Sequence, residues 1–238
     1  MVTAMFDGLR LAHWQADRRP DGILVLTLDR ADQGVNALSR GVLDELEAMI
    51  ERIVLELPKG IVIRSGKDAG FIPGADIKGF EEIAAKGLVE DWIRRGQLVF
   101  QKLAELRCPT VAAIHGHCMG GGTEIALACR YRIASRDEKT RIGLPEIKLG
   151  IYPGWGGSVR APRLIGAPAA MDLMLTGRSL SASAAKAMGL VDRVVDHAVL
   201  LDEAVKLAQR GMQRPFKQRF LAWATNTGVA RAVLAPQM

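Results

Sequence analysis

The sequence predicts an α/β fold. Three apolar runs that are typical of buried strands (residues 23–28, 60–65 and 110–114) alternate with segments in which apolar residues recur at helical spacing. Glycine-rich stretches follow two of these strands, and each leads into a predicted helix. Strands that alternate with helices in this way favour an α/β architecture. The chain has 238 residues, of which 49% are hydrophobic and 24% are charged, which is enough for one large domain or two small ones.

The first half of the chain opens with a predicted hairpin. A strand at 9–15 pairs with the strand at 23–28, because Pro20-Asp21-Gly22 is a turn signal between them. Ser39 is a good N-cap for an amphipathic helix over 40–56, which Pro58 and Gly60 end. After the strand at 60–65, the spacing predicts helices over 77–85 and 88–106.

The second half continues the alternation. We expect a strand at 131–135, a charged turn at 136–140 and a third glycine-rich loop at 150–157. The remaining elements are helices over 158–165, 167–175 and 182–188, a strand over 191–195 and a helix over 198–211. After Pro215 the chain is basic and is expected to be irregular.

Composition excludes several classes of protein. No apolar run approaches the roughly 20 residues that a transmembrane helix needs, and residues 1–19 lack the layout of a signal peptide. A cytoplasmic location is therefore expected. The three cysteines, Cys108, Cys118 and Cys129, lie in apolar contexts, so they are predicted to be buried free thiols rather than disulfides or metal ligands.

The chain is basic, with a net charge of +6 and a pI of about 9.5. A mild cluster of basic residues lies near the C-terminus, at Arg210, Arg214, Lys217 and Arg219. This balance suits an anionic partner, either a phosphorylated small molecule or a nucleic acid, although a solvated surface explains any single basic residue more simply. Aromatic residues make up only 5% of the chain and do not alternate with basic ones, so nucleic acid is the less favoured partner.

The stretch His115-Gly116-His117-Cys118-Met119-Gly120-Gly121-Gly122-Thr123-Glu124 organises the prediction of a site. It joins the strand at 110–114 to a helix, and glycines at such a junction let a ligand approach the backbone N–H groups closely. The helix start favours a negatively charged oxygen, and Glu124 lies in its first turn.

Glu146 is a second carboxylate, placed between Pro145 and the third glycine loop. Taken singly, Glu124 complements a helix dipole and Glu146 is a solvated turn residue. Together they suggest general acid and base chemistry, which requires environments that separate their pKa values.

Other catalytic signatures are missing from the sequence. We find no P-loop, His-Glu-x-x-His, paired Cys-x-x-Cys or Gly-x-Ser-x-Gly motif, so no metal site is predicted. His115 and His117 are expected to be hydrogen-bonded structural residues, although either could be catalytic.

Three groups of residues match a known family. They are 71–78 (Phe-Ile-Pro-Gly-Ala-Asp-Ile-Lys), 120–124 (Gly-Gly-Gly-Thr-Glu), and 144–147 (Leu-Pro-Glu-Ile) followed by 153–157 (Pro-Gly-Trp-Gly-Gly). Over about residues 10–200 the chain resembles the enoyl-CoA hydratase/isomerase (crotonase) family. It is most similar to the N-terminal hydratase part of multifunctional fatty-acid β-oxidation proteins, in which a 3-hydroxyacyl-CoA dehydrogenase part follows. On this resemblance the chain would be a piece of a longer protein.

The resemblance implies a fold. It is a crotonase-like spiral of repeated ββα units, with a catalytic core at residues 1–200 and a C-terminal helical and basic segment at 201–238. The family usually assembles as trimers or dimers of trimers, and the multifunctional members are parts of larger complexes. No membrane partner is implied.

The resemblance also implies a site. The backbone N–H groups of Ala75 and Gly121 would form an oxyanion hole for the thioester oxygen of an acyl-CoA. Glu124 would activate a water, Glu146 would protonate the α-carbon, and the Gly154 backbone would help to position the water. The residues expected to bind the CoA thioester are Ala75, Asp76, Ile77, Lys78 and Gly121. No metal is implied, and no cofactor apart from the coenzyme A of the substrate.

The activity implied is hydration of trans-2-enoyl-CoA to 3-hydroxyacyl-CoA. The alternatives are Δ3-Δ2-enoyl-CoA isomerisation by the same site, an RNA-binding role suggested by the pI, and a non-catalytic oligomerising module. Trp155 stands where the family usually has a small residue. Its ring would either narrow the acyl pocket or face away from it and pack.

Overall fold

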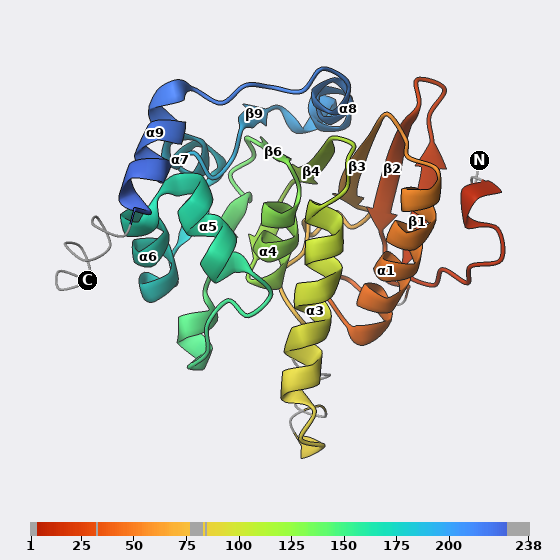
Figure 1. Cartoon of the computed structure of the whole chain (residues 1–238), viewed down its shortest axis with the longest axis horizontal. Coiled ribbons are helices and arrows are strands. Elements are labelled where there is room, and N and C mark those ends of the chain that lie inside the picture. The colour runs from red at the N-terminus through yellow and green to blue at the C-terminus, as the bar shows by residue number, and fades with distance from the viewer. Residues whose placement is uncertain (1–3, 32, 77–82, 84, 228–238) are drawn as a thin grey trace.

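A six-stranded sheet forms the centre of the computed structural model, which describes residues 4–31, 33–76, 83 and 85–227 (Figure 1). The strand order is β1-β2-β3-β4-β6-β9; β1 is antiparallel to β2, and the other neighbours are parallel. The strands are β1 (Trp14–Arg18), β2 (Ile23–Leu28), β3 (Gly60–Ser65), β4 (Thr110–Ile114), β6 (Tyr131–Ser135) and β9 (Arg193–Val195).

Both faces of this sheet are buried, which explains why its central strands are continuous apolar runs. Leu24 and Leu26 of β2 point into one hydrophobic cluster, together with helix α1 (Arg40–Leu55). Ile23 and Val25 point to the opposite face, into a second cluster with helix α8 (Leu200–Arg210). Successive residues of a strand face opposite sides, so a strand covered on both sides must be apolar throughout.

A second sheet gives the chain its spiral form. It contains three short strands, β5 (His117–Met119), β7 (Arg141–Gly143) and β8 (Ser179–Ser181). The chain passes from β4 of the large sheet to β5 of the small one and then into α4 (Gly121–Ala128). It repeats this path through β6, β7 and α5 (Gly157–Ile165), so the predicted repetition of ββα units is confirmed.

The remaining helices lie where the spacing predicts them. Ser39 caps α1, because its Oγ accepts a hydrogen bond from the Val42 amide at 3.3 Å. The other elements are α3 (Val89–Ala104), α6 (Ala167–Thr176), α7 (Ala182–Met188), and the 3₁₀ turns η1 (Ala4–Phe6), η2 (Glu146–Leu149) and η3 (His197–Val199). Most of the helix expected at 77–85 lies outside the described residues, which omit 77–82 and 84.

Two of the predicted elements are wrong. The strand expected at 9–15 is β1 at Trp14–Arg18, because the turn at 19–22 fixes the register Trp14↔Leu28 and Arg18↔Leu24. The segment after Pro215 is a helix, α9 (Phe216–Thr225), rather than irregular chain. It is held against α5 by Asn226, whose side-chain amide donates to the Pro162 carbonyl at 2.8 Å.

The C-terminal part packs on the rest of the chain. α8 covers one face of the large sheet, and α9 lies beside α5 and α6 at the end of the molecule remote from β1 (Figure 1). A domain boundary at residue 200 stays a prediction. No helix within the described ranges is long and apolar enough to cross a membrane. All three cysteines are buried and free, as predicted.

Candidate active site

Glu124 is a buried carboxylate in the first turn of α4. Gly120, with φ at +53°, turns the chain from β5 into this helix, a conformation that glycine adopts without strain. The side chain of Glu124 does not reach solvent, since the residue is only 3% exposed. Its Oε1 accepts hydrogen bonds from the backbone N–H groups of Trp155 at 2.7 Å and Gly157 at 2.8 Å. The third glycine loop therefore holds this carboxylate through two backbone hydrogen bonds.

Glu146 is also buried, but neither of its carboxylate oxygens has a hydrogen-bond partner among the described residues. It begins η2, directly after Pro145. A Cβ atom added to Gly120 would lie 3.4 Å from Glu146 Oε1, so this carboxylate faces the start of α4. A buried polar group without a partner is costly in a folded protein and is a recognised mark of a functional site.

Both carboxyl groups have strongly raised pKa values. Burial raises the pKa of Glu124 to about 7, the two backbone hydrogen bonds oppose this, and the nearby charge of Glu146 adds to it. Burial likewise raises the pKa of Glu146 to about 7. Two interacting groups that titrate near neutral pH can share one proton, which gives the pair an acid and a base at once.

Gly121 and Ala75 carry the two backbone N–H groups that the sequence predicts for an oxyanion hole. Gly121 is the first residue of α4, so its N–H has no acceptor within the helix. Ala75 forms a single parallel bridge with Leu38, in which Gly74 O accepts from the Leu38 amide and the Asp76 amide donates to Leu38 O. This pattern uses the peptide groups on either side of Ala75 and directs the Ala75 N–H away from Leu38.

The chain segments that carry these two amides are tied together. Ile72 bridges to Cys118 of β5, with its N–H donating to His117 O at 3.0 Å and its carbonyl accepting from Met119 N at 3.0 Å. A Cβ on Gly122 would come within 2.0 Å of the Ile72 carbonyl oxygen. The glycine at 122 thus permits α4 to start directly against the 70–75 segment, and only glycine fits this contact.

The family model for enoyl-CoA hydratase/isomerase matches residues 18–237, which is most of the chain. The chain belongs to the enoyl-CoA hydratase/isomerase family. Among solved structures, it is similar to an enoyl-CoA hydratase from Bacillus anthracis, with 32% identity and a TM-score of 0.75 over 91% of this chain and 83% of that one. An enoyl-CoA hydratase from Thermoplasma volcanium is 29% identical, with a TM-score of 0.74 over 95% and 88% of the two chains. The fold is therefore the crotonase fold.

Curated relatives of this family member are longer than it is. The fatty acid oxidation complex subunit alpha of Vibrio cholerae is 42% identical over 221 residues, which are 89% of this chain and 31% of the relative. The corresponding subunit of Shewanella amazonensis is 44% identical over 84% of this chain and 29% of its own. The chain thus spans about a third of the length of the curated relatives it matches.

The structure brings some of the predicted site residues together and not others. Glu124, Glu146 and Gly121 meet at the start of α4, and Ala75 lies on the segment packed against it. Asp76 forms an ion pair with Arg30 at 3.1 Å. Ile77 and Lys78 lie outside the described residues.

The third glycine loop contributes more than the sequence predicted. The Gly154 carbonyl accepts from Gln97 Nε2 at 2.7 Å, whereas the amides that hold Glu124 are those of Trp155 and Gly157. These two amides were missed, because a backbone donor carries no side-chain signal. The signal that the sequence does offer is the Gly156-Gly157 pair, because glycines indicate a close approach of the backbone. The structure shows that approach, since a Cβ on Gly157 would lie 3.1 Å from Glu124 Oε1.

Arg160 is a further residue that was missed. It donates to the Trp155 carbonyl at 3.0 Å, and its charge favours the ionised form of Glu124. The guanidinium therefore supports the loop that holds this carboxylate.

The ring of Trp155 packs between helices α3 and α4. It makes edge contacts with Trp92 and Phe100, at centroid distances of 5.3 and 5.7 Å. Cβ atoms added to Gly96 and Gly121 would lie 2.4 and 2.8 Å from it, so glycines on both helices make room for the indole. Trp155 was expected either to narrow the acyl pocket or to pack against its neighbours. Packing is what the structure shows, and the ring lies directly against Gly121.

The histidines have structural contacts. His115 Nε2 lies 2.8 Å from the Lys67 carbonyl oxygen, and the ring contacts His197 edge-on at 5.1 Å. His117 is exposed in β5.

Proposed function

We propose that this chain is an enoyl-CoA hydratase that adds water across the double bond of trans-2-enoyl-CoA to give 3-hydroxyacyl-CoA in fatty-acid β-oxidation. The observation that carries the proposal is the pair of buried glutamates, both with pKa values near 7, at the start of α4. The hydratase names of similar solved structures and the fatty acid oxidation names of the relatives support it.

The two carboxyl groups are assigned different roles by their contacts. Hydrogen bonds from Trp155 and Gly157 favour the ionised form of Glu124, so it is the base. Glu146 lacks such donors in the described chain, so it holds the proton and is the acid. The unpartnered oxygens of Glu146 also suit a shared water between the two groups.

The proposed reaction balances as a simple addition. Glu124 takes one proton from water as the water oxygen bonds to the β-carbon of the substrate. The electrons of the double bond move toward the thioester carbonyl, and Glu146 delivers its proton to the α-carbon. The Ala75 and Gly121 N–H groups hold the oxygen on which negative charge develops, and one such donor is typically worth about 2.7–4 kcal/mol. Coenzyme A enters only as part of the substrate.

Loss of crotonyl-CoA absorbance on adding the protein tests the activity. Glu124→Gln should lower kcat by roughly 10²–10⁴-fold, the usual contribution of a general base, and leave CoA binding intact. The matched control is Glu138→Gln, which removes an exposed carboxylate from the 136–140 turn and should leave turnover unchanged. Turnover near that of the wild type in Glu124→Gln would overturn the assignment.

The related isomerase activity is the second candidate, because Glu146 by itself faces the start of α4 and could move one proton between two carbons. The same variants distinguish the two reactions. A hydratase loses activity in both Glu124→Gln and Glu146→Gln, whereas a site that acts mainly as an isomerase on 3-enoyl-CoA needs only one of the two carboxyl groups.

The cellular setting is part of the proposal. We propose a cytoplasmic location and assembly as a homotrimer or dimer of trimers, or as part of a multifunctional complex. The names of the relatives support the last of these, since they are subunits of a fatty acid oxidation complex. Sedimentation equilibrium of the purified chain would give the subunit count.

A further inference from the structure

A second polar region lies at the other end of α4, away from the glutamates. It consists of two cavities of about 400 and 340 Å³ that share Arg163, Leu164 and Arg214 in their walls. We call the combined feature the arginine groove. Six arginines line it: Arg130, Arg132, Arg160, Arg163, Arg214 and Arg219. No Asp or Glu is among the described residues that line either cavity.

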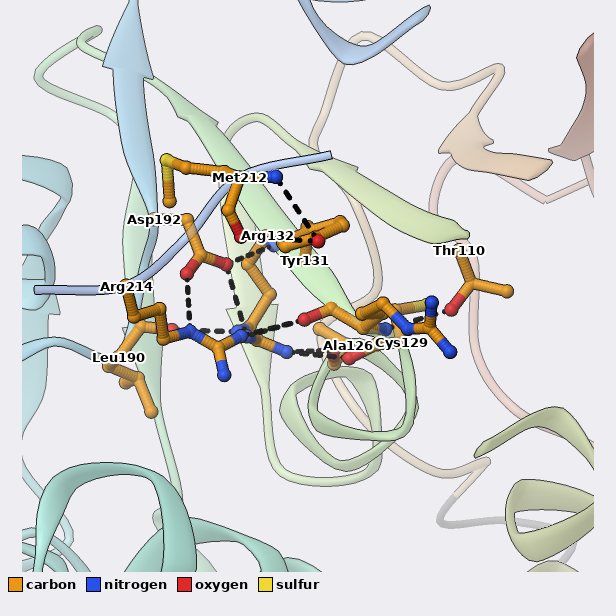
Figure 2. Close-up of polar contacts among 10 residues, drawn as sticks. Thr110, Ala126, Cys129, Tyr131, Arg132, Leu190, Asp192, Met212 and Arg214 are labelled. Carbon is orange, nitrogen blue, oxygen red and sulfur yellow. Dashed lines mark hydrogen bonds and ion pairs between the residues drawn. The ribbon is translucent and has the colours of Figure 1, made fainter. Parts of the chain in front are cut away.

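Three of the arginines build the floor of the groove. Arg132, 3% exposed in its side chain, donates to the carbonyls of Ala126 and Cys129 at the end of α4 and pairs with Asp192 at 3.1 Å (Figure 2). Arg214 pairs with the other oxygen of Asp192 at 2.8 Å (Figure 2). Arg160 is held by the Trp155 carbonyl and by Gln101. These contacts hold three guanidinium groups in place. Asp192 is their one carboxylate partner within the described residues, so most of their positive charge is not neutralised.

The other three arginines have no ion pair within the described part of the chain. Arg130, Arg163 and Arg219 are exposed at the edges of the groove. The charge of Arg163 at the edge adds to the burial that lowers the pKa of Arg160 in the floor. Within the floor, the charge of Arg214 likewise lowers the pKa of Arg132. Like charges held this close are destabilising unless an anion offsets them.

The sequence supplies no acidic residue from the C-terminal segment to offset this charge. Residues 204–238 contain six basic residues and no Asp or Glu. The basic cluster noted near the C-terminus therefore contributes Arg214 and Arg219 to the groove, and the proposed hydration reaction makes no use of it.

Trp223 gives the groove an aromatic wall. It lines the larger cavity together with Arg163, Arg214 and Arg219, and it is 66% exposed. An exposed indole beside guanidinium groups provides a stacking surface for a nucleobase next to donors for phosphate oxygens. The cavity volumes lie in the range of small-molecule sites rather than of a flat macromolecular surface.

We propose that the arginine groove binds a nucleotide that carries two or more phosphate groups, with the phosphates on Arg130, Arg163 and Arg219 and the base against Trp223. Such a nucleotide could be free or could be the nucleotide end of a coenzyme A ester. Both sources present the same chemistry to the groove.

Calorimetric titration of the whole chain with ADP, pyrophosphate, inorganic phosphate and adenosine tests the proposal. ADP and pyrophosphate should bind more tightly than phosphate or adenosine. Arg163→Gln and Arg219→Gln should each weaken ADP binding about tenfold or more, as expected for the loss of a charge-assisted hydrogen bond. The matched control is Arg52→Gln, which removes the same charge from an exposed position on α1.

Trp223 provides a separate readout. The other three tryptophans are at most 6% exposed, so quenching of tryptophan fluorescence by ADP reports on Trp223. ADP should quench and pyrophosphate should not. Trp223→Leu should weaken ADP binding and leave pyrophosphate binding unchanged.

Two substrates distinguish the sources of the nucleotide and separate this proposal from the proposed function. If the groove holds the nucleotide end of coenzyme A, Arg163→Gln raises KM for crotonyl-CoA but not for crotonyl-N-acetylcysteamine, which has no nucleotide. If it binds a free nucleotide, neither KM changes while ADP binding still falls. Failure of hydration with both substrates in the wild type affects only the proposed function.

Three results would overturn the proposal. They are absence of ADP binding by the wild type, ADP binding by Arg163→Gln and Arg219→Gln equal to that of Arg52→Gln, and binding of single-stranded RNA without binding of ADP.

Discussion

Glu124 and Glu146 are the same residue type in similarly buried positions, and they differ in what their oxygens contact. Two backbone amides hold Glu124, whereas Glu146 has no partner in the described chain. This difference divides the acid and base roles in the proposed reaction. The difference arises because the third glycine loop directs two of its amides to Glu124 and none to Glu146.

Stability should depend on pH through Glu146. Its pKa is raised from 4.5 to about 7, so between these values the folded protein keeps a proton that the unfolded chain releases. The free energy of unfolding therefore falls as pH rises from 4.5 to 7 and levels off above 7. Glu146→Gln cannot ionise, so it should match the wild type near pH 4 and be about 3 kcal/mol more stable at pH 8.

Urea unfolding at pH 4 and pH 8 would measure this difference. Glu138→Gln, which removes an exposed carboxylate, should show no comparable change with pH. A Glu146→Gln variant with the same stability difference at both pH values would contradict the raised pKa.

At the scale of elements, the position of α4 depends on glycine at residue 122, where a side chain would collide with the neighbouring segment. Gly122→Ala would place a methyl group 2.0 Å from the Ile72 carbonyl oxygen, so the helix must move away from the 70–75 segment. We expect a loss of about 1–3 kcal/mol of stability, as is usual for overpacking, and a lower kcat because Gly121 and Glu124 move with the helix. Gly34→Ala, with open space around it, is the matched control. Unchanged turnover in Gly122→Ala would show that the placement of α4 is not critical.

The opposite end of α4 depends on a buried ion pair. Arg132 joins Asp192 to the last carbonyls of the helix (Figure 2). Arg132→Met removes the donor to the Cys129 carbonyl and one of the two guanidinium partners of Asp192, and it should cost about 3–5 kcal/mol, measured by urea unfolding. The exposed pair Arg136–Asp196 gives the comparison, and Arg136→Met should cost less than about 1 kcal/mol. A small effect of Arg132→Met would mean that Arg214 and the backbone N–H of residue 132 together satisfy Asp192.

At the scale of the whole molecule, two clusters of apolar side chains cover the two faces of one sheet. The three cysteines are buried, and burial raises the pKa of Cys118 and Cys129 to about 12. All three thiols should therefore resist a thiol reagent in the native state and react together in denaturant. Rapid reaction of any thiol in the native protein would show local opening of these clusters.

The sequence by itself determined the elements whose signals are local. Apolar runs identified the strands of the large sheet, helical spacing and the Ser39 cap identified α1, and the glycines before Glu124 identified the start of α4. The matched motifs also indicated the family and both glutamates. These features depend on neighbours along the chain, so the residues themselves carry them.

Only the tertiary structure decided how these parts meet. The three-residue strands β5, β7 and β8 are too short to show a period, and they exist because each pairs with a distant partner. α9 forms because α5 offers it a surface, which is why the segment after Pro215 gave no clear helical signal. The amides that hold Glu124 lie 31 and 33 residues away from it, and the arginines of the groove come from three separate segments. Contacts of this kind depend on how the two sheets and their helices pack, and packing is a property of the assembled chain rather than of any one stretch of it.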